Sequence, residues 1–197
     1  MYFISVIRLY SIIMNPAGDL TKLHREIEKC TKCSLFKTRI NAVPGEGPVT
    51  ARLMFVGEAP GAKEDELGRP FVGRSGILLT ELLSEAGIDR NNVFITSILK
   101  SRPPNNRKPT SEEVKACLPY LMKQIEIVSP KIIVLLGSVA VNSLIGPWKL
   151  GDAHGKFHES ASGLLFFITH HPAACLRFPK YRELMLEDLR ILNSKLS

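Results

Sequence analysis

The sequence predicts an α/β fold, a three-layer α/β/α sandwich around a central four-stranded parallel sheet. Four short apolar runs are nearly continuous rather than alternating, which is typical of strands buried on both faces of a parallel sheet. Helical patterns lie between the runs, and this alternation favours a sandwich with right-handed crossovers. The chain has 197 residues, 45% of them hydrophobic, which suits one domain with a full core. The four runs are 52–56, 93–99, 132–136 and 164–169.

Helices are indicated by apolar residues at helical spacing and by end signals. Residues 19–32 carry an apolar stripe, with Asp19 as the predicted N-cap. The stretch 111–128 has two glutamates in its first turn, where negative charge is favourable. Further helices are predicted over 74–87, 138–146 and 180–195.

The first residues do not fit this pattern. Arg8 interrupts the first apolar run, and a credible helix starts only after Met14. We therefore expect residues 1–13 to be an extension outside the fold and residues 14–197 to form a single domain. The run also lacks the cationic start and cleavage site of a signal peptide, and no apolar stretch nears the roughly 20 residues that span a bilayer. An intracellular protein without a membrane partner is expected.

The chain is basic, with a formal net charge of +7. This balance favours a polyanionic partner such as nucleic acid, because each neutralised phosphate releases counterions. A protein with surplus lysine is the alternative. Cys30 and Cys33 form a Cys-x-x-Cys pair, which in an intracellular protein indicates metal or redox chemistry more often than a structural disulfide.

Titratable side chains follow the first and last predicted strands. The segment 57–61 reads Gly-Glu-Ala-Pro-Gly, and the segment 170–174 reads His-His-Pro-Ala-Ala. Open α/β sheets place their ligand crevice at the carboxyl ends of the strands, so Glu58 and His171 are expected to converge. An acid and an imidazole there suggest charge stabilisation or proton chemistry. An ordinary turn and a structural histidine are the alternatives.

A glycine-rich segment, 68–76, leads into the second helix. Its Phe71 lies between glycines and offers either a stacking face for a planar base or a side chain for the core. Backbone amides near Arg74 and Ser75, at the start of a helix, are expected to receive a phosphate.

Two later segments carry candidate DNA contacts. The loop 100–109 combines four cations with prolines, which suits an element that grips a phosphate backbone through Arg102 and Arg107, although a solvated charged loop is the default. After the last strand, Leu176 and Arg177 suggest a wedge and a clamp for duplex DNA.

Together these segments resemble the uracil-DNA glycosylase superfamily, most closely its family four, the iron–sulfur type of bacteria and archaea. The resemblance covers residues 19 to about 195 and rests on Cys-x-x-Cys, Gly-Glu-Ala-Pro-Gly, Gly-Arg-Pro-Phe-Val-Gly, Arg-Pro-Pro-x-Asn-Arg and His-Pro-Ala. It implies a monomeric, monofunctional hydrolase that flips uracil out of single- or double-stranded DNA. Cleavage of the N-glycosidic bond would then start base-excision repair.

The resemblance also implies roles for individual residues. His171 would donate to the developing negative oxygen of uracil, and Glu58 would position water or stabilise the cationic sugar. Phe71 would stack on the base, while backbone amides at Glu58 and Ala59 fix its edge. Another family of the superfamily carries a water-activating aspartate where Ala59 stands, which leaves Glu58 as the candidate for that task here.

The chain departs from the family pattern at Ser97, where Asn usually reads the uracil edge. A hydroxyl both donates and accepts, but its reach is shorter and its two contacts are not rigidly paired. Bidentate readout is worth about 1–3 kcal/mol, so uracil selectivity is expected to weaken, or the range of deaminated bases to widen.

A second departure concerns the [4Fe-4S] cluster that the resemblance implies. Its ligands would be Cys30, Cys33, Cys117 and a cysteine at the position of Ser101. A serine oxygen is a poorer iron ligand than a thiolate, so the cluster is expected to be intact but labile, three-iron or absent. Zinc on the three cysteines is the rival, and Cys175 is an unlikely substitute because it falls in the predicted DNA-facing loop.

Three other functions compete with uracil excision. A glycosylase for hypoxanthine, xanthine or another lesion would keep the fold and change the substrate. A non-catalytic, lesion-binding homologue would explain both serines. The presence of Glu58, Phe71 and His171 argues against this alternative. A thiol oxidoreductase lacks the preceding strand and the cis-proline context for its Cys-x-x-Cys pair.

Overall fold

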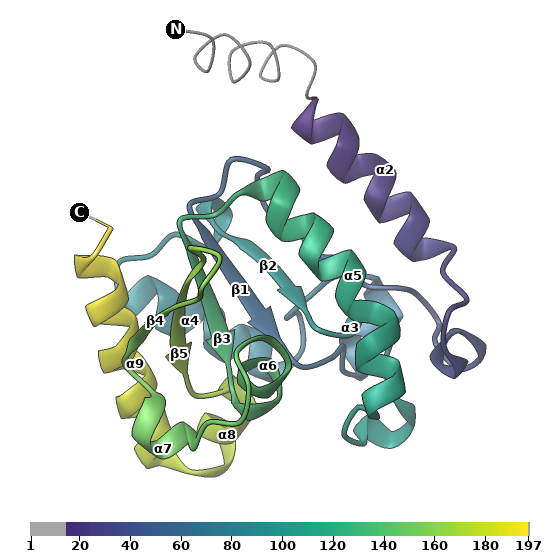
Figure 1. The fold of residues 1–197 in the computed structure, drawn as a ribbon. Coiled ribbons are helices and arrows are strands. Elements are labelled where there is room, and N and C mark those ends of the chain that lie inside the picture. Colours follow the sequence, from purple (N-terminus) through teal and green to yellow (C-terminus); the bar gives the residue numbers. More distant parts are fainter. Residues whose placement is uncertain (1–14, 197) are drawn as a thin grey trace, which may run out of the picture.

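The computed structural model describes residues 15–196, in which helices cover both faces of a five-stranded sheet (Figure 1). The strand order is β2-β1-β3-β5-β4. β1 pairs in parallel with β2 and β3, and β3 pairs in parallel with β5, which confirms the four predicted parallel strands. The strands are β1 (Leu53–Gly57), β2 (Phe94–Ser97), β3 (Ile132–Leu136), β4 (Phe157–Glu159) and β5 (Leu165–Thr169).

The fifth strand corrects the expected four-stranded, all-parallel sheet. β4 lies at the edge and runs antiparallel to β5, with Phe157 opposite Phe167. It has three residues, of which only Phe157 is apolar, so no continuous run marks it in the sequence. An edge strand is paired on one side only, which permits this polar composition.

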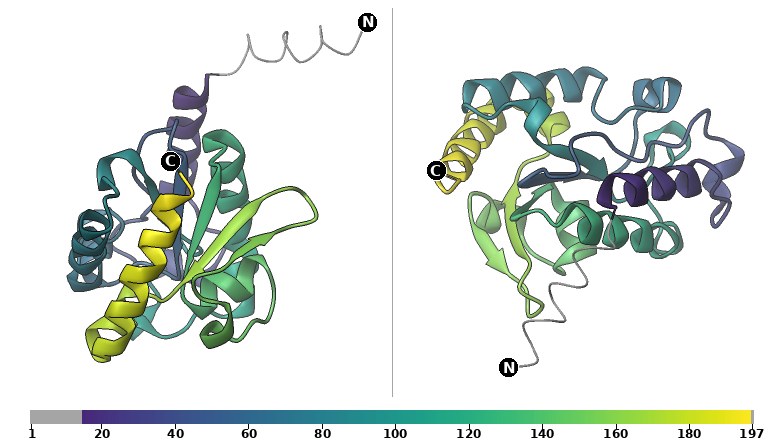
Figure 2. Two further views of the ribbon diagram at one scale, coloured as in Figure 1. Left: turned by 90° about the vertical axis from the view of Figure 1, so that its left-hand side faces the viewer. Right: turned by 90° about the horizontal axis from the view of Figure 1, so that it is seen from above.

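The sheet separates two hydrophobic cores. Alternate residues of each strand point to opposite faces, so Phe55 and Phe167 pack on the side of α4 and α9, and Met54 and Ile133 on the side of α5 and α6. Figure 2 shows the same layering from the side and from above. Burial on both faces explains why the strands read as nearly continuous apolar runs. These helices are α4 (Arg74–Glu85), α5 (Ser111–Val128), α6 (Ser138–Leu144) and α9 (Pro179–Ser194).

The first described helix, α2 (Pro16–Glu28), begins earlier than predicted. Asn15 is its N-cap, because the Asn15 side chain accepts a hydrogen bond from Gly18 N at 3.0 Å, so the assignment of Asp19 was wrong. Six further short helical elements of residues 15–196 carry too few residues for a helical period to be read from sequence. They are α3 (Ala62–Leu67), α7 (Leu150–Ala153), α8 (Pro172–Arg177) and the 3₁₀ turns η1 (Ser34–Lys37), η2 (Arg90–Asn92) and η3 (Pro104–Asn106).

The carboxyl ends of the parallel strands meet along one edge of the sheet. In the β1–β2 register Gly57 lies opposite Ser97, and in the β3–β5 register Leu136 lies opposite Thr169. The loops that follow these strands therefore start side by side. Among residues 15–196 no helix has both the length and the apolarity to span a membrane. The expected extension, residues 1–13, lies outside the described residues, and the single domain over 14–197 stays a prediction.

Candidate functional site

The strand ends open into one cleft of about 580 Å³. Five predicted site residues, from four separate segments of the chain, line it together. They are Glu58, Ala59, Phe71, Ser97 and His171. The parallel register explains why the residues at the strand ends converge, whereas Phe71 comes from the loop between α3 and the helix that starts at Arg74.

Phe71 has an unusual backbone and close neighbours. Its φ is +50°, a left-handed conformation that costs energy for a residue with a side chain. A Cβ atom on Gly57 would lie 2.6 Å from the Phe71 ring, and one on Gly76 would lie 1.9 Å from the Phe71 carbonyl oxygen. Phe71 is 7% exposed, joins the core on the α4 side and also lines the cleft. Its packing in the core is confirmed, and its stacking on a base stays a prediction.

His171 caps α8, and its hydrogen bond defines the imidazole tautomer. Nδ1 accepts from Ala173 N at 3.1 Å, so the proton of the neutral ring lies on Nε2. Desolvation lowers the pKa of His171 to about 4, although the charge of Glu64 acts in the opposite direction. The ring centroid lies 5.8 Å from that of Phe71. At neutral pH His171 is therefore an uncharged hydrogen-bond donor beside an aromatic face.

Two carboxylates line the cleft, and they differ in the hydrogen bonds that they accept. Burial raises the pKa of Glu58, an effect that the charge of Lys108 partly offsets, and no group within residues 15–196 donates a hydrogen bond to its carboxylate. Glu64 accepts three backbone hydrogen bonds instead. Sequence analysis missed Glu64, and the available signal was its position: an acid three residues after Gly61, at the start of a short helix.

Ser97 is buried at the cleft, and its carbonyl oxygen accepts a hydrogen bond from Lys100 Nζ at 2.7 Å. The same ammonium donates to Gln124 Oε1 at 2.7 Å and to the Thr96 hydroxyl. Lys100 is only 2% exposed, and burial lowers its pKa to about 7. Lys100, one of the four cations of the loop 100–109, therefore points into the protein and not toward a polyanion.

The predicted DNA contacts divide into two groups. Ser75, Arg107 and Arg177 line the cleft, whereas Arg74, Arg102 and Leu176 are outside its lining. Arg107 is not a free cation, because both terminal guanidinium nitrogens donate to the Glu113 carboxylate, at 2.6 and 2.9 Å.

An aromatic side chain that the sequence analysis did not single out extends this surface. Phe178, at the end of α8, lines the cleft and is 54% exposed. Leu176 on the same helix is also exposed, as a wedge requires. Both side chains are therefore accessible from solvent beside the cleft.

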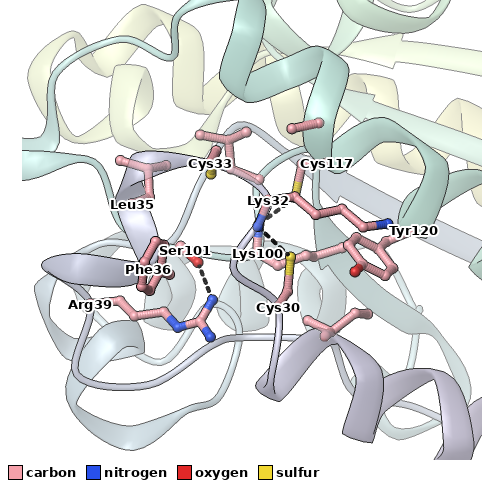
Figure 3. Close-up of a pocket in the computed structure, with 13 residues that line it drawn as sticks. Cys30, Lys32, Cys33, Leu35, Phe36, Arg39, Lys100, Ser101, Cys117 and Tyr120 are labelled. Carbon is pink, nitrogen blue, oxygen red and sulfur yellow. Dashed lines mark hydrogen bonds between the residues drawn. The ribbon is translucent and has the colours of Figure 1, made fainter.

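A second hollow lies away from the cleft and contains the predicted metal ligands (Figure 3). Cys30, Cys33, Cys117 and Ser101 all line it, and the Ser101 hydroxyl accepts a hydrogen bond from Arg39 Nη1 at 2.9 Å. The Lys100 backbone N–H donates to Cys117 Sγ at 3.2 Å. Within residues 15–196 no three His, Cys, Asp or Glu side chains are arranged to hold a single metal ion.

Cys175 does not reach this hollow. It is buried between α8 and α9, where its Sγ lies 3.7 Å from Met185 Sδ and 3.3 Å from the carbonyl oxygen of Tyr181. Its side chain points into the core on the α4 side, which keeps Cys175 away from the predicted metal ligands.

Comparison with known proteins identifies the family. Residues 44–190 match the family model described as the uracil DNA glycosylase superfamily. The chain is 51% identical over 179 residues to a type-4 uracil-DNA glycosylase of Pyrobaculum aerophilum, covering 87% of this chain and 91% of the relative. It is 46% identical over 188 residues to a type-4 enzyme of Saccharolobus solfataricus, with 91% and 87% covered. A type-4 enzyme of Thermotoga maritima is 46% identical over 167 residues, with 83% and 87% covered.

The chain belongs to the uracil-DNA glycosylase superfamily, and within it to the type-4 uracil-DNA glycosylases. The predicted resemblance is confirmed, and so is the fold, a mostly parallel sheet flanked by helices. Ser97 lies in the cleft with Glu58, Phe71 and His171, and Ser101 lies in the hollow with the three cysteines.

Two partly buried histidines, His24 and His171, predict a pH-dependent stability. Desolvation lowers the pKa of both His171 and His24 to about 4, below their value of about 6.5 in an unfolded chain. Between these values the unfolded chain binds more protons than the folded chain. The contribution of these histidines to the free energy of unfolding is therefore complete above pH 6.5 and decreases as the pH falls toward 4. Thermal unfolding of the wild type and of His171→Gln across this pH range measures how steeply the stability changes with pH. The variant should show a shallower slope, and an unchanged slope would contradict the burial of this imidazole.

Proposed function

We infer that this protein is a DNA glycosylase that flips uracil out of DNA and hydrolyses its N-glycosidic bond, the first step of base-excision repair. The convergence of Glu58, Phe71 and His171 on one cleft carries the inference. The identity to type-4 uracil-DNA glycosylases supports the choice of uracil as the base. The substrate is uracil-containing DNA, single or double stranded, and the protein acts on it as a monomer inside the cell.

The chemistry requires positive charge on the sugar and negative charge on the departing base to be stabilised at the same time. His171 serves the base. Its neutral ring holds the proton on Nε2 and donates it in a hydrogen bond to the developing oxyanion, with no change in protonation beforehand. A preorganised donor of this kind is worth about 3–4 kcal/mol in a site shielded from water.

Glu58 serves the sugar and the attacking water. Its carboxylate accepts no hydrogen bond from residues 15–196 and is half-buried in the cleft, so its oxygens are available to a water molecule and to a cationic sugar. Glu64 is a poor candidate for this task because three backbone amides already occupy its oxygens. This difference between the two carboxylates favours Glu58 as the group that positions water.

The remaining predicted site residues bind the base and the DNA backbone. Phe71 offers its ring to the flipped base, and backbone amides of the turn at Glu58 and Ala59 are close enough to the cleft to define the edge of the base. Arg177 and Ser75 contact the phosphate backbone beside the extruded nucleotide. The net charge of +7 supports this assignment, because phosphate contacts supply most of the sequence-independent affinity for DNA.

The residues of the second hollow fit an iron–sulfur cluster. Three reduced cysteines and Ser101 share this hollow, and a backbone N–H already donates to Cys117 Sγ, as is common for thiolate ligands. We propose that Cys30, Cys33 and Cys117 hold the cluster and that Ser101 stands at the fourth position. When bound, the cluster cross-links α2 to α5, and closure of so long a loop is worth about 4–5 kcal/mol by analogy with a disulfide.

The activity is tested with oligonucleotides that each carry one deaminated base. Release of uracil and formation of an abasic site are expected for the wild type. Glu58→Ala and His171→Ala should each lower the single-turnover rate by about 10²–10³-fold, because each removes a group that acts in the transition state. Glu66→Ala is the matched control, since Glu66 is exposed on α3, pairs with Lys63 and is not among the residues that line the cleft. Binding without cleavage on every lesion would favour the non-catalytic homologue.

Ser97 favours a broadened base specificity as the second candidate. The side chain is buried at the cleft in the place where the family carries a bidentate amide. Ser97→Asn should raise the rate on uracil relative to hypoxanthine and xanthine by about tenfold, within the range that bidentate readout provides. Ser84→Asn, on the outer face of α4, is the control. An unchanged ratio of rates would remove Ser97 as a determinant of specificity.

The cluster is tested by metal analysis of protein purified without air. Iron and sulfide in a brown sample are expected, and Ser101→Cys should increase the iron retained after exposure to air because a thiolate binds iron better than a hydroxyl does. Cys175→Ser should leave the iron content unchanged, since Cys175 lies outside the hollow. A colourless, zinc-loaded protein would contradict the assignment.

A further inference from the structure

Glu64 is a buried carboxylate at the cleft that the proposed chemistry does not use. It lies on α3, is 8% exposed and borders the same cleft as Glu58 and Phe71. A carboxylate is rarely buried to this extent unless its oxygens are hydrogen-bonded, so its partners indicate its purpose.

The partners of Glu64 come from two different turns. Oε1 accepts from the backbone N–H of Val72 at 2.9 Å and of Gly73 at 2.7 Å. Oε2 accepts from the N–H of Gly61 at 3.2 Å. Glu64 therefore joins the turn that contains Glu58 to the turn that contains Phe71. Hydrogen bonds to an ionised acceptor are stronger than those between neutral groups.

Both turns leave room for this carboxylate. A Cβ atom on Gly61 would lie 2.7 Å from Glu64 Oε2, and one on Gly73 would lie 3.2 Å from Oε1. A side chain at Gly61 would displace the carboxylate, and one at Gly73 would crowd it. The two glycines and Glu64 thus form one unit in which the acid lies directly against the backbone.

The unit lies next to Phe71, a cleft residue with a left-handed backbone. Phe71 has a φ of +50°, and the amides that follow it, at Val72 and Gly73, are those that Glu64 holds. A residue keeps such a conformation only when its surroundings enforce it. Gly57 and Gly76 admit the ring and the carbonyl of Phe71 by lacking side chains, but they do not pull the turn into place.

We propose that Glu64 is a positioning residue for base recognition: its carboxylate holds the left-handed turn at Phe71, so that the aromatic ring is preorganised for the flipped uracil. The proposal rests on the proposed function, in which Phe71 stacks on the base. Glu64 itself does not touch the substrate. It acts through the backbone of Val72 and Gly73.

The negative charge of Glu64 does not explain a loss of activity through His171. That charge raises the pKa of His171 against the larger lowering by desolvation. Without the charge, His171 would stay neutral over a still wider range of pH. A defect of a Glu64 variant at neutral pH therefore does not arise from protonation of the imidazole.

A double-mutant cycle tests the proposal. Phe71→Ala, Glu64→Gln and the double variant are compared for binding to DNA that carries a non-hydrolysable 2′-fluorinated deoxyuridine, and for single-turnover excision of uracil. The amide of Glu64→Gln keeps the volume and one acceptor, but its NH₂ group faces the N–H of Gly61, so the turn loosens without a cavity. Glu66→Gln, exposed on the same helix, is the matched control. Thermal unfolding of each variant identifies any that do not fold.

If Glu64 acts through Phe71, Phe71→Ala should weaken binding by about tenfold or more, in keeping with the loss of one base–aromatic stack. Glu64→Gln should weaken it severalfold, and the double variant should be no weaker than Phe71→Ala alone. Losses that multiply in the double variant, or a Glu64→Gln variant with wild-type binding, would overturn the proposal. Should Glu64→Gln fail to fold, the Glu64→Asp variant, with a shorter carboxylate, replaces it in the same cycle.

The experiment separates this proposal from the proposed function. A wild type that excises uracil while Phe71→Ala binds equally well would overturn the positioning role and leave the glycosylase activity intact. A wild type that does not excise uracil would contradict the proposed function itself.

Discussion

The cleft depends on one close approach, that of the Phe71 ring to Gly57 at the carboxyl end of β1. A side chain at Gly57 would collide with the ring, since its Cβ atom would lie 2.6 Å from Phe71 Cζ. Because Gly57 pairs with Ser97 of β2, the ring sits at the point where the two strands present their ends to the cleft. His171 reaches the same ring from β5 and α8. The aromatic face, the imidazole and the serine are therefore neighbours only as long as position 57 carries no side chain.

The fold was largely predictable because burial on both faces leaves a strong signal. Residues of β1, β3 and β5 are apolar whichever face they point to, and the long helices between them repeat an apolar stripe. Prediction failed where the structure uses few residues or relies on side-chain capping. β4 has three residues, of which one is apolar, and the start of α2 depends on a bond from Gly18 to Asn15 that no periodicity reveals.

The sequence predicted which residues form the site better than it predicted their burial and their hydrogen bonds. Glu58 and His171 follow strands, so their convergence on the cleft follows from the topology of a parallel sheet. Glu64 and Lys100 were missed because composition and apolar spacing do not distinguish a buried, hydrogen-bonded side chain from a solvated one. For Glu64, its position three residues after Gly61 was the one available signal. Lys100 looked like part of a basic loop, yet its ammonium lies inside the protein and donates to Ser97, Thr96 and Gln124.

Lys100 and Glu64 are buried side chains whose hydrogen bonds hold the backbone around the cleft. Lys100 holds the carbonyl of Ser97 at the end of β2, and Glu64 holds the amides after Phe71. Lys100 also donates its backbone N–H to Cys117 in the second hollow, so the proposed cluster and the base cleft share one segment of chain. Preorganisation of this kind lets a neutral imidazole and a carboxylate separate charge without rearrangement.

The central claim is that the loops at one edge of the sheet form a pocket that separates charge across a sugar–base bond. A crystal structure with DNA that carries 2′-fluorinated deoxyuridine tests it most directly. The account predicts an extruded uracil stacked on Phe71, with an oxygen of the base facing His171 Nε2 and the sugar facing Glu58. A base bound elsewhere on the protein, or an extruded uracil that contacts neither Phe71 nor His171, would contradict it.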